Sequence, residues 1–188
     1  RLIMRLNGKQ TPTLTVVSRR SLILAAPFVL MGTNIGRAQE STPPKLSGPV
    51  LLTVDGDISV PNHGNNAIFD RAMLDELTQR EFATSTIWTQ DVKVFSGPTL
   101  QGILDYVGAG PGDIRANALS NYSSYLRRTE VTQDTPIIAT RIDGMPFPVR
   151  EKGPLWIVFP YDRHPSFRSE LIYAMSVWQL ESLTITPR

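Results

Sequence analysis

This 188-residue chain lacks the common sequence patterns of metal ligands and activated nucleophiles. There is no cysteine, and the two histidines, His63 and His164, lie far apart in the sequence. The motifs H-x-x-x-H, H-E-x-x-H and G-x-S-x-G are absent, so neither a zinc or iron site of the usual kind nor a common serine hydrolase is supported. The glycine-rich run 108–112 lacks the Lys-Ser/Thr pair of a phosphate loop and follows a predicted helix, which indicates a helix stop.

The remaining candidates for chemistry are aromatic, amide and charged side chains in predicted loops and at strand ends. Side chains of these types can stack on a flat ring and form hydrogen bonds with its edge. Side chains of these types can line a site that binds a small ligand noncovalently.

These side chains must be positioned by the elements of the fold, and the length of the chain favours one domain with one core. The best predicted helix spans 69–82, where Asp70 can act as N-cap and Leu74 lies on the apolar face. A second predicted helix, 100–107, ends at the glycine-rich run. Residues 171–177 are compatible with either a strand or a short helix.

Apolar runs rich in β-branched residues predict several strands. A first hairpin is expected from 50–54 and 58–60, around Asp55-Gly56-Asp57. Strands at 84–88 and 92–95 are expected to pair around a Thr-Gln-Asp turn. The other predicted strands are 114–122, 136–142 ending in an Asp143-Gly144 turn, 156–159 and 180–185.

Three segments carry a resemblance to a known family. Pro136 to Pro160, PIIATRIDGMPFPVREKGPLWIVFP, resembles the "NG-x-PLP…GGPLRLVVP" segment of the sulfite-oxidase molybdopterin-binding fold. Residues 95–104 resemble that family's "W-x-G-V-x-L-x-x-LL" segment, and 118–122 occupy the place of its "A-x-x-S-x-DGY" strand. The resemblance extends over about 50–185 and implies an α+β fold with a mixed β-sheet core and short helices.

The resemblance also implies a pterin ligand. In the enzymes of the superfamily a cysteine thiolate binds molybdenum, because a soft anionic sulfur suits the metal, and this chain has no cysteine. The molybdenum cofactor is therefore less expected than a reduced pterin, such as a tetrahydropterin. The chain is most similar to small exported members without the metal ligand, some of which report a reduced pterin to a membrane-bound cyclic-di-GMP enzyme or sensor kinase.

The family's site can be carried over residue by residue. By position, the resemblance implies ligand contacts from four parts of the chain. Thr86, Trp88 and Thr89 lie in the segment that follows the family's cysteine strand, and Asn121 and Tyr122 lie at the strand end that matches its Asp-Gly-Tyr. Arg150, Glu151 and Lys152 lie in the loop beside the cofactor, and Tyr161 and Arg163 lie in the region of its phosphate. The family's lysine before Trp178 is replaced by Val177, which favours a pterin without the dithiolene-phosphate arm.

Each of these assignments has a structural alternative. Trp88 could fill the core, as buried tryptophans do in many domains. Asn121 and Tyr122 could form an ordinary turn. The charged run 150–152 could be a solvated loop, in place of a site where Glu151 accepts from the guanidine-like edge of a pterin.

Residues 1–38 have the layout of a secretory signal peptide: basic residues up to Arg19-Arg20, an apolar run at 22–31 and small residues before a cleavage site expected ahead of Gln39. The segment also resembles a twin-arginine signal, and the arginines alone do not separate this route from the general one. The apolar run is short for a bilayer span, which argues against a membrane anchor. Residues 39–49 are expected to form a flexible tether to a domain at 50–188.

The basic balance of the chain comes from the predicted signal peptide. Six of the 19 basic residues and none of the 17 acidic ones lie in 1–38, which leaves 13 basic against 17 acidic residues and a net charge of −4. Nucleic-acid binding by bulk electrostatics is therefore disfavoured.

The sequence thus predicts a periplasmic, non-catalytic pterin-binding protein that relays ligand occupancy to the periplasmic domain of a membrane signalling protein. One alternative is a subunit of a molybdopterin-dependent oxidoreductase that holds the cofactor without a cysteine ligand. Another is a degenerate domain that acts only by binding protein.

Overall fold

The computed structural model describes residues 46–187. The predicted signal peptide and most of the predicted tether lie outside the described residues. At the end of that tether, the backbone N–H groups of Ser47 and Gly48 donate hydrogen bonds to the carboxylate of Asp70. Within 46–187, no helix has both the length and the hydropathy needed to cross a bilayer.

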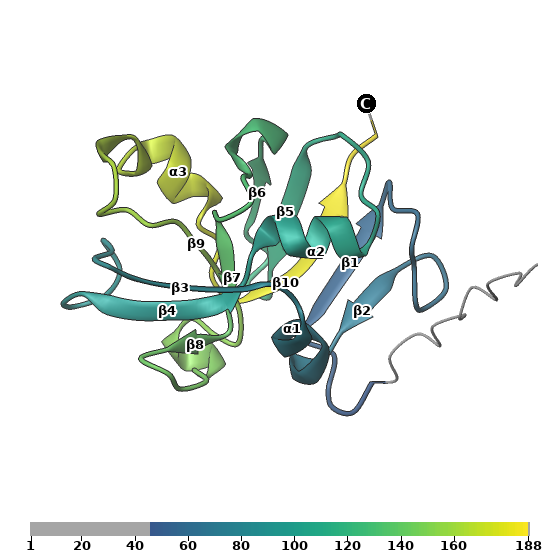
Figure 1. Cartoon of the computed structure of the whole chain (residues 1–188), viewed down its shortest axis with the longest axis horizontal. Coiled ribbons are helices and arrows are strands. Elements are labelled where there is room, and N and C mark those ends of the chain that lie inside the picture. The colour runs from purple at the N-terminus through teal and green to yellow at the C-terminus, as the bar shows by residue number, and fades with distance from the viewer. Residues whose placement is uncertain (1–45, 188) are drawn as a thin grey trace, which may run out of the picture. The chain divides into compact units, whose positions relative to one another are not determined.

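The largest sheet has five strands in the order β2-β1-β10-β5-β6, and Figure 1 shows them side by side. Strands β1 and β10 pair in parallel, and the other neighbours in this sheet pair antiparallel. The last strand in the sequence therefore lies in the middle of the sheet. The strands are β1 (Leu52–Gly56), β2 (Ala67–Phe69), β5 (Ile114–Ala118), β6 (Ser123–Leu126) and β10 (Leu180–Ile185).

Two smaller sheets complete the β-structure. One has the order β3-β4-β8 and the other pairs β7 with β9. At Gly97 in β4 a Cβ atom would lie 2.1 Å from the carbonyl oxygen of Ile138, so only glycine allows β4 and β7 to approach this closely. The bounds are β3 (Gln79–Thr84), β4 (Lys93–Pro98), β7 (Ile137–Ala139), β8 (Arg141–Ile142) and β9 (Trp156–Val158).

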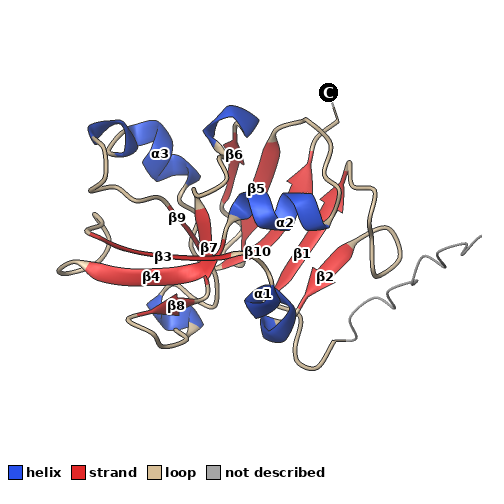
Figure 2. Cartoon of the chain, viewed as in Figure 1, coloured by secondary structure: helices blue, strands red, loops and turns tan. Residues whose placement is uncertain are grey.

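The helices are short, and each α-helix begins at a side-chain cap. Asp70, Thr99 and Ser169 accept hydrogen bonds from backbone N–H groups in the first turns of α1, α2 and α3. Helix α2 lies across one face of the five-stranded sheet (Figures 1 and 2). The helices are α1 (Arg71–Glu76), α2 (Leu100–Tyr106) and α3 (Glu170–Met175), with 3₁₀ turns η1 (Arg128–Glu130), η2 (Val149–Glu151) and η3 (Pro165–Phe167).

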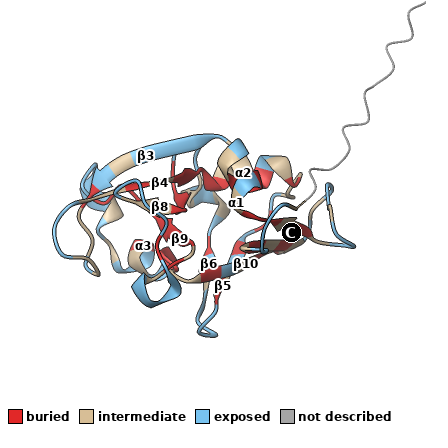
Figure 3. Cartoon of the chain, turned by 90° about the horizontal axis from the view of Figure 1, so that it is seen from below, coloured by how far each residue is buried: buried red, intermediate tan, exposed pale blue. Residues whose placement is uncertain are grey.

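Burial follows the place of each strand in the fold (Figure 3). Strands β1, β5 and β10 alternate buried apolar with more exposed residues, as expected for strands with one covered face. Every residue of β7 and β9 is buried. Strand β3 is exposed along most of its length. Strand β9 contributes Trp156, the largest fully buried side chain, so the two small sheets share the core of the domain.

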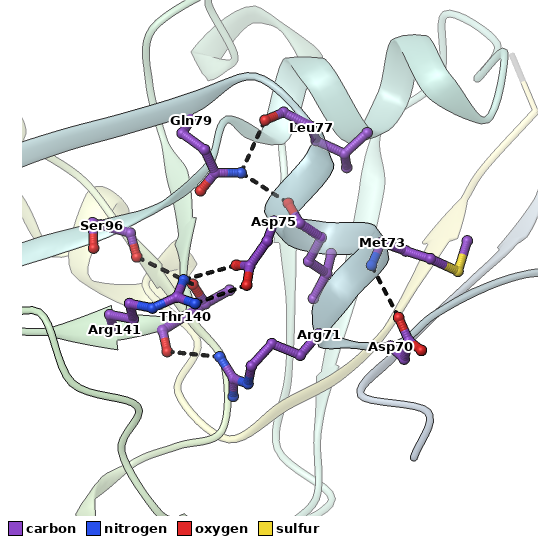
Figure 4. A network of polar contacts seen from close by, with 10 residues as sticks. Asp70, Arg71, Met73, Asp75, Leu77, Gln79, Ser96, Thr140 and Arg141 are labelled. Atoms are coloured by element: carbon purple, nitrogen blue, oxygen red, sulfur yellow. Dashed lines mark hydrogen bonds and ion pairs between the residues drawn. The ribbon is translucent and has the colours of Figure 1, made fainter. Parts of the chain in front are cut away.

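A polar network joins α1 to the end of β8. Figure 4 shows Asp75 facing Arg141, whose two guanidinium N–H donors each lie 2.7 Å from a carboxylate oxygen of Asp75. Arg71 donates to the carbonyl oxygen of Thr140. The hydrogen bonds from Arg141 lower the pKa of Asp75 and raise that of Arg141.

Several sequence predictions are wrong in register or pairing. The helix expected at 69–82 ends at Glu76, and β3 begins at Gln79 and pairs with β4, because pairing with a distant strand outweighs the local helical pattern. The hairpin expected from 50–54 and 58–60 does not form. Strand β1 pairs with β2 and β10, and Ile58 makes only an isolated bridge to Ala109. The strand expected at 84–88 lies earlier, so Trp88 is in a loop.

Other predictions are confirmed. The Asp70 cap, the helix at 100–107, the Asp143-Gly144 turn and the closing strand at 180–185 are all present. Residues 170–175 form a helix, which resolves the ambiguity at 171–177. The strand expected at 114–122 is confirmed only as far as Ala118, where β5 ends, and residues 119–122 form the turn before β6. The structure is thus of the mixed α+β class that was expected.

Candidate functional site

The loop 85–92, between β3 and β4, places Trp88 through a compact turn. The Thr86 hydroxyl oxygen accepts hydrogen bonds from the N–H groups of Trp88 and Thr89, at 3.1 and 2.9 Å. The hydroxyls of Thr86 and Thr89 lie 2.8 Å apart and form a further hydrogen bond. Threonine is suited to this position because its hydroxyl can replace a backbone acceptor in a turn. Thr86 therefore fixes the backbone that carries Trp88.

The same loop is tied to the chain that follows β9. The backbone N–H and the hydroxyl of Ser85 both donate to the carboxylate of Asp162, which also pairs with Arg168. In return, the hydroxyl of Thr84 accepts from the N–H of Asp162. The hydrogen bonds from Ser85, followed by the pairing with Arg168, lower the pKa of Asp162.

The ring of Trp88 lies at the centre of an aromatic cluster. Its centroid is 5.3 Å from that of Trp178, 5.6 Å from Tyr173, 5.8 Å from Trp156 and 6.3 Å from Tyr161. These separations and the steep interplanar angles are those of edge-to-face aromatic pairs. Trp88 is only half-buried, so it both packs against the core and faces a cleft.

That cleft has a volume of about 290 Å³. Tyr122 closes one side, because its hydroxyl crosses to helix α3 and donates to the carbonyl oxygen of Ala174 at 3.0 Å. The preceding Asn121 has a φ of 63°, in the left-handed region that asparagine adopts more readily than most residues, and this turn brings Tyr122 to the cleft. The lining residues are Trp88, Ala118, Ser120, Tyr122, Tyr173, Ser176 and Trp178.

A buried chain of hydrogen bonds supports the floor of the cleft. The Tyr161 hydroxyl donates to the hydroxyl of Ser176 at 2.7 Å, and Ser176 donates to the carbonyl oxygen of Ile172, also at 2.7 Å. The indole N–H of Trp156 donates to the backbone oxygen of Ser176. Burial raises the pKa of Tyr161, so its hydroxyl stays protonated. Ser176 is therefore held in place from behind by satisfied polar groups.

A second, larger cavity of about 560 Å³ has a different character. Its lining carries three basic and three acidic side chains. Lys93 pairs with Asp143, and Arg150 pairs with Glu151. The N–H of Val94 and the ammonium of Lys93 lower the pKa of Asp143. The lining residues are Thr89, Gln90, Asp91, Lys93, Ile142, Asp143, Met145, Pro146, Phe147, Arg150, Glu151, Lys152 and Trp156.

Six of the ten residues implied by the resemblance line one or other of these two cavities. Trp88 and Tyr122 line the aromatic cleft, while Thr89 and the charged run 150–152 line the larger cavity. Tyr161 lies beneath Trp88 and is buried. The other three occupy supporting or exposed positions: Thr86 in the turn that carries Trp88, Asn121 in the turn before β6, and Arg163 exposed on the loop after β9.

Sequence reasoning missed five of the seven residues that line the cleft: Ala118, Ser120, Tyr173, Ser176 and Trp178. Tyr173 and Ser176 lie three positions apart, at the end of α3 and just beyond it, which places them on one side of the helix. Once 170–175 is known to be helical, this spacing is a usable signal. The approach of Trp178 to Trp88 depends on contacts across the fold and has no signal in local sequence.

Neither a scan against protein-family models nor a search of curated proteins finds a match to this chain. Among residues 46–187, no group of three or more His, Cys, Asp or Glu side chains is arranged to hold a metal ion. The candidate site is therefore argued from its own geometry.

Proposed function

We propose that this protein binds a reduced pterin in the aromatic cleft and acts without catalysing a reaction on it. The observation that carries the proposal is the position of the Trp88 side chain at the cleft. A turn bonded by Thr86 and anchored through Asp162 holds this half-buried indole against a cleft with three further aromatic walls. Aromatic side chains in a concave, mostly apolar site are what a flat heterocycle requires.

The side chains present fit a pterin in size and in type. A volume of about 290 Å³ lies at the lower end of small-molecule sites, about 300–1,000 Å³, so the cleft suits a compact bicyclic ring better than one with a long substituent. Ser120 and Tyr122 belong to the lining: the Ser120 hydroxyl can donate to or accept from the polar edge of the ring, and the Tyr122 hydroxyl, which donates to Ala174, can accept from it. A bound pterin would supply a flat polar surface for recognition and no chemical step.

The fold and the relay to a partner are part of the same proposal. We infer a fold of the sulfite-oxidase type, supported by the resemblance at 136–160 and compatible with the mixed sheets. Exposed apolar side chains flank the cleft walls in sequence: Ile87, Leu119 and Leu171 are 64%, 46% and 43% exposed. A contiguous patch of exposed apolar side chains is what marks an interaction surface, and the proposal is that these three contribute to one. A signalling partner, the periplasmic part of a cyclic-di-GMP enzyme or sensor kinase, would sense the ligand through differential contacts at this rim.

The alternative with the molybdenum cofactor has weaker support. The phosphate of that cofactor calls for an excess of basic side chains. In the larger cavity Lys93, Arg150 and Lys152 are balanced by Asp91, Asp143 and Glu151. The alternative of a domain that only binds protein predicts no affinity for any pterin.

The test is a binding titration with a tetrahydropterin under anaerobic conditions. We expect partial quenching of tryptophan fluorescence, and Trp88→Ala should weaken binding by about 1–3 kcal/mol through lost stacking and buried area. Tyr106→Ala is the matched control, because Tyr106 is also a half-buried aromatic residue but packs against Phe69, away from the cleft. Circular dichroism must show that both variants are folded. Unchanged affinity in folded Trp88→Ala would refute the site.

A further inference from the structure

The walls of the aromatic cleft are inclined to one another. The plane of Trp88 makes an angle of 86° with Tyr173 and 65° with Trp178, at centroid distances of 5.6 and 5.3 Å. A flat ring is sandwiched only between parallel walls, so it cannot be sandwiched between Trp88 and either of these two rings. Steeply inclined walls instead surround a compact group with several π-systems at once. This is the arrangement of an aromatic cage.

The charges of the lining point in the same direction. No Asp, Glu, Lys, Arg or His side chain is among the described residues that line the cleft. The Ser176 hydroxyl already donates to Ile172 and accepts from Tyr161, so it is committed to the fold. An anion would find no cationic partner in this lining. A cation would find a lining with four aromatic rings, whose π-systems attract positive charge.

We propose that the cleft is a cation-selective aromatic cage, made by Trp88, Tyr122, Tyr173 and Trp178, for a ligand that presents an ammonium group. The inference rests on the proposed function where it concerns pterins. Reduction converts imine-type ring nitrogens of a pterin into amine nitrogens, and amines are the more readily protonated. The cage therefore favours the reduced ring over the oxidised one, and occupancy reports the redox state of the pterin.

The probe is choline, compared with its neutral carbon isostere, in which a tert-butyl group replaces the trimethylammonium group. The two have nearly the same shape and differ in charge. We expect choline to bind the full protein about tenfold more tightly than the isostere, as measured by calorimetry and by displacement of a tetrahydropterin. Tetrahydropterin itself should bind at least about tenfold more tightly than the oxidised pterin.

Substitutions at Tyr122 separate a cation–π contribution from simple apolar contact. Tyr122 is 50% exposed, so its replacement leaves the core intact. Tyr122→Phe keeps the ring and removes the hydroxyl that donates to Ala174, whereas Tyr122→Leu removes the ring. We expect Phe to retain choline affinity within about twofold and Leu to lose about three- to tenfold. Tyr125→Leu, at an exposed tyrosine outside the lining, is the control and should have no effect.

The outcomes distinguish this inference from the proposed function. Equal affinity for choline and its isostere, or an undiminished preference for choline in Tyr122→Leu, would overturn the cage. Tetrahydropterin binding that choline does not compete with would also overturn the cage and leave the proposed function standing. Choline binding without pterin binding would support the cage and remove the proposed function.

Discussion

Asp162 has no contact with the cleft, yet it determines where Trp88 lies. Its carboxylate accepts two hydrogen bonds from Ser85, at the start of the loop that carries Trp88, and a third from Arg168. The carboxylate thereby joins two segments far apart in the sequence. Trp88 therefore depends on a polar anchor as well as on its aromatic neighbours.

Replacing Asp162 with Asn should weaken pterin binding without changing any residue of the lining. The neutral amide is a poorer acceptor for the two Ser85 donors, so the loop loses part of its preorganisation. We expect affinity to fall about three- to tenfold, with the variant still folded, on the scale of one weakened charged hydrogen bond. Arg163→Gln, at an exposed neighbour, is the control. Full affinity in Asp162→Asn would show that the anchor does not position the site.

The difference in stability between the parent protein and Asp162→Asn should depend on pH. The folded state lowers the pKa of Asp162 below its usual value of 3.8, so this carboxylate stabilises the fold above about pH 4 and the contribution is lost as pH falls through the folded pKa. Urea denaturation at pH 7 and pH 3 should show the parent more stable than Asp162→Asn at pH 7 and a smaller difference at pH 3. A difference that is constant with pH would contradict this.

At the scale of elements, short helices and small sheets are held together by specific side-chain links. The ion pair between Asp75 of α1 and Arg141 of β8 is bidentate, and both side chains are about one-third exposed, at 34% and 30%. Strand β8 has only two residues, and it leads into the Asp143-Gly144 turn at the larger cavity. Together with the hydrogen bond from Arg71 to Thr140, the pair links α1 to this part of the fold.

A double-mutant cycle should measure this link. Because solvent screens a partly exposed pair, we expect a coupling free energy of about 0.5–1 kcal/mol between Asp75→Ala and Arg141→Ala, from denaturant unfolding. The exposed pair Arg80–Asp134, with side chains 46% and 58% exposed, is the matched comparison and should couple more weakly. Equal coupling in the two cycles would show that bidentate geometry adds nothing here.

At the scale of the whole molecule, the cleft collects side chains from three distant parts of the chain. Trp88 comes from the loop before β4, Tyr122 from the turn before β6, and Tyr173 and Trp178 from α3 and the segment before β10. Ligand binding should therefore stabilise contacts across the fold.

Purified protein from cells that make the molybdenum cofactor should contain no stoichiometric molybdenum. The reason is chemical, because the chain has no cysteine to supply the thiolate that the metal favours. Elemental analysis by mass spectrometry is the measurement, with a molybdenum enzyme from the same cells as positive control. One molybdenum atom per chain would favour the oxidoreductase alternative over the proposed function.

Local signals in the sequence were sufficient for several elements. Asp70 was identified as a cap because a carboxylate before an apolar helical run satisfies free N–H groups, and the Asp143-Gly144 turn because both residues tolerate positive φ. The helix at 69–82 failed because its second half, Gln79 onward, pairs with β4. An apolar pattern that fits both a helix and a strand is decided by the partner that is available.

The sequence by itself determined the chemistry that the chain possesses: no thiolate, two isolated histidines, and a tryptophan in a segment singled out by its resemblance. Only the tertiary structure decided that Trp88 meets Tyr173 and Trp178, while Glu151 lines a different cavity. The physical reason is that a cleft is made by packing between segments far apart in the chain. Local propensities describe each segment but not which segments meet, because long-range pairing and burial select among the arrangements that those propensities allow.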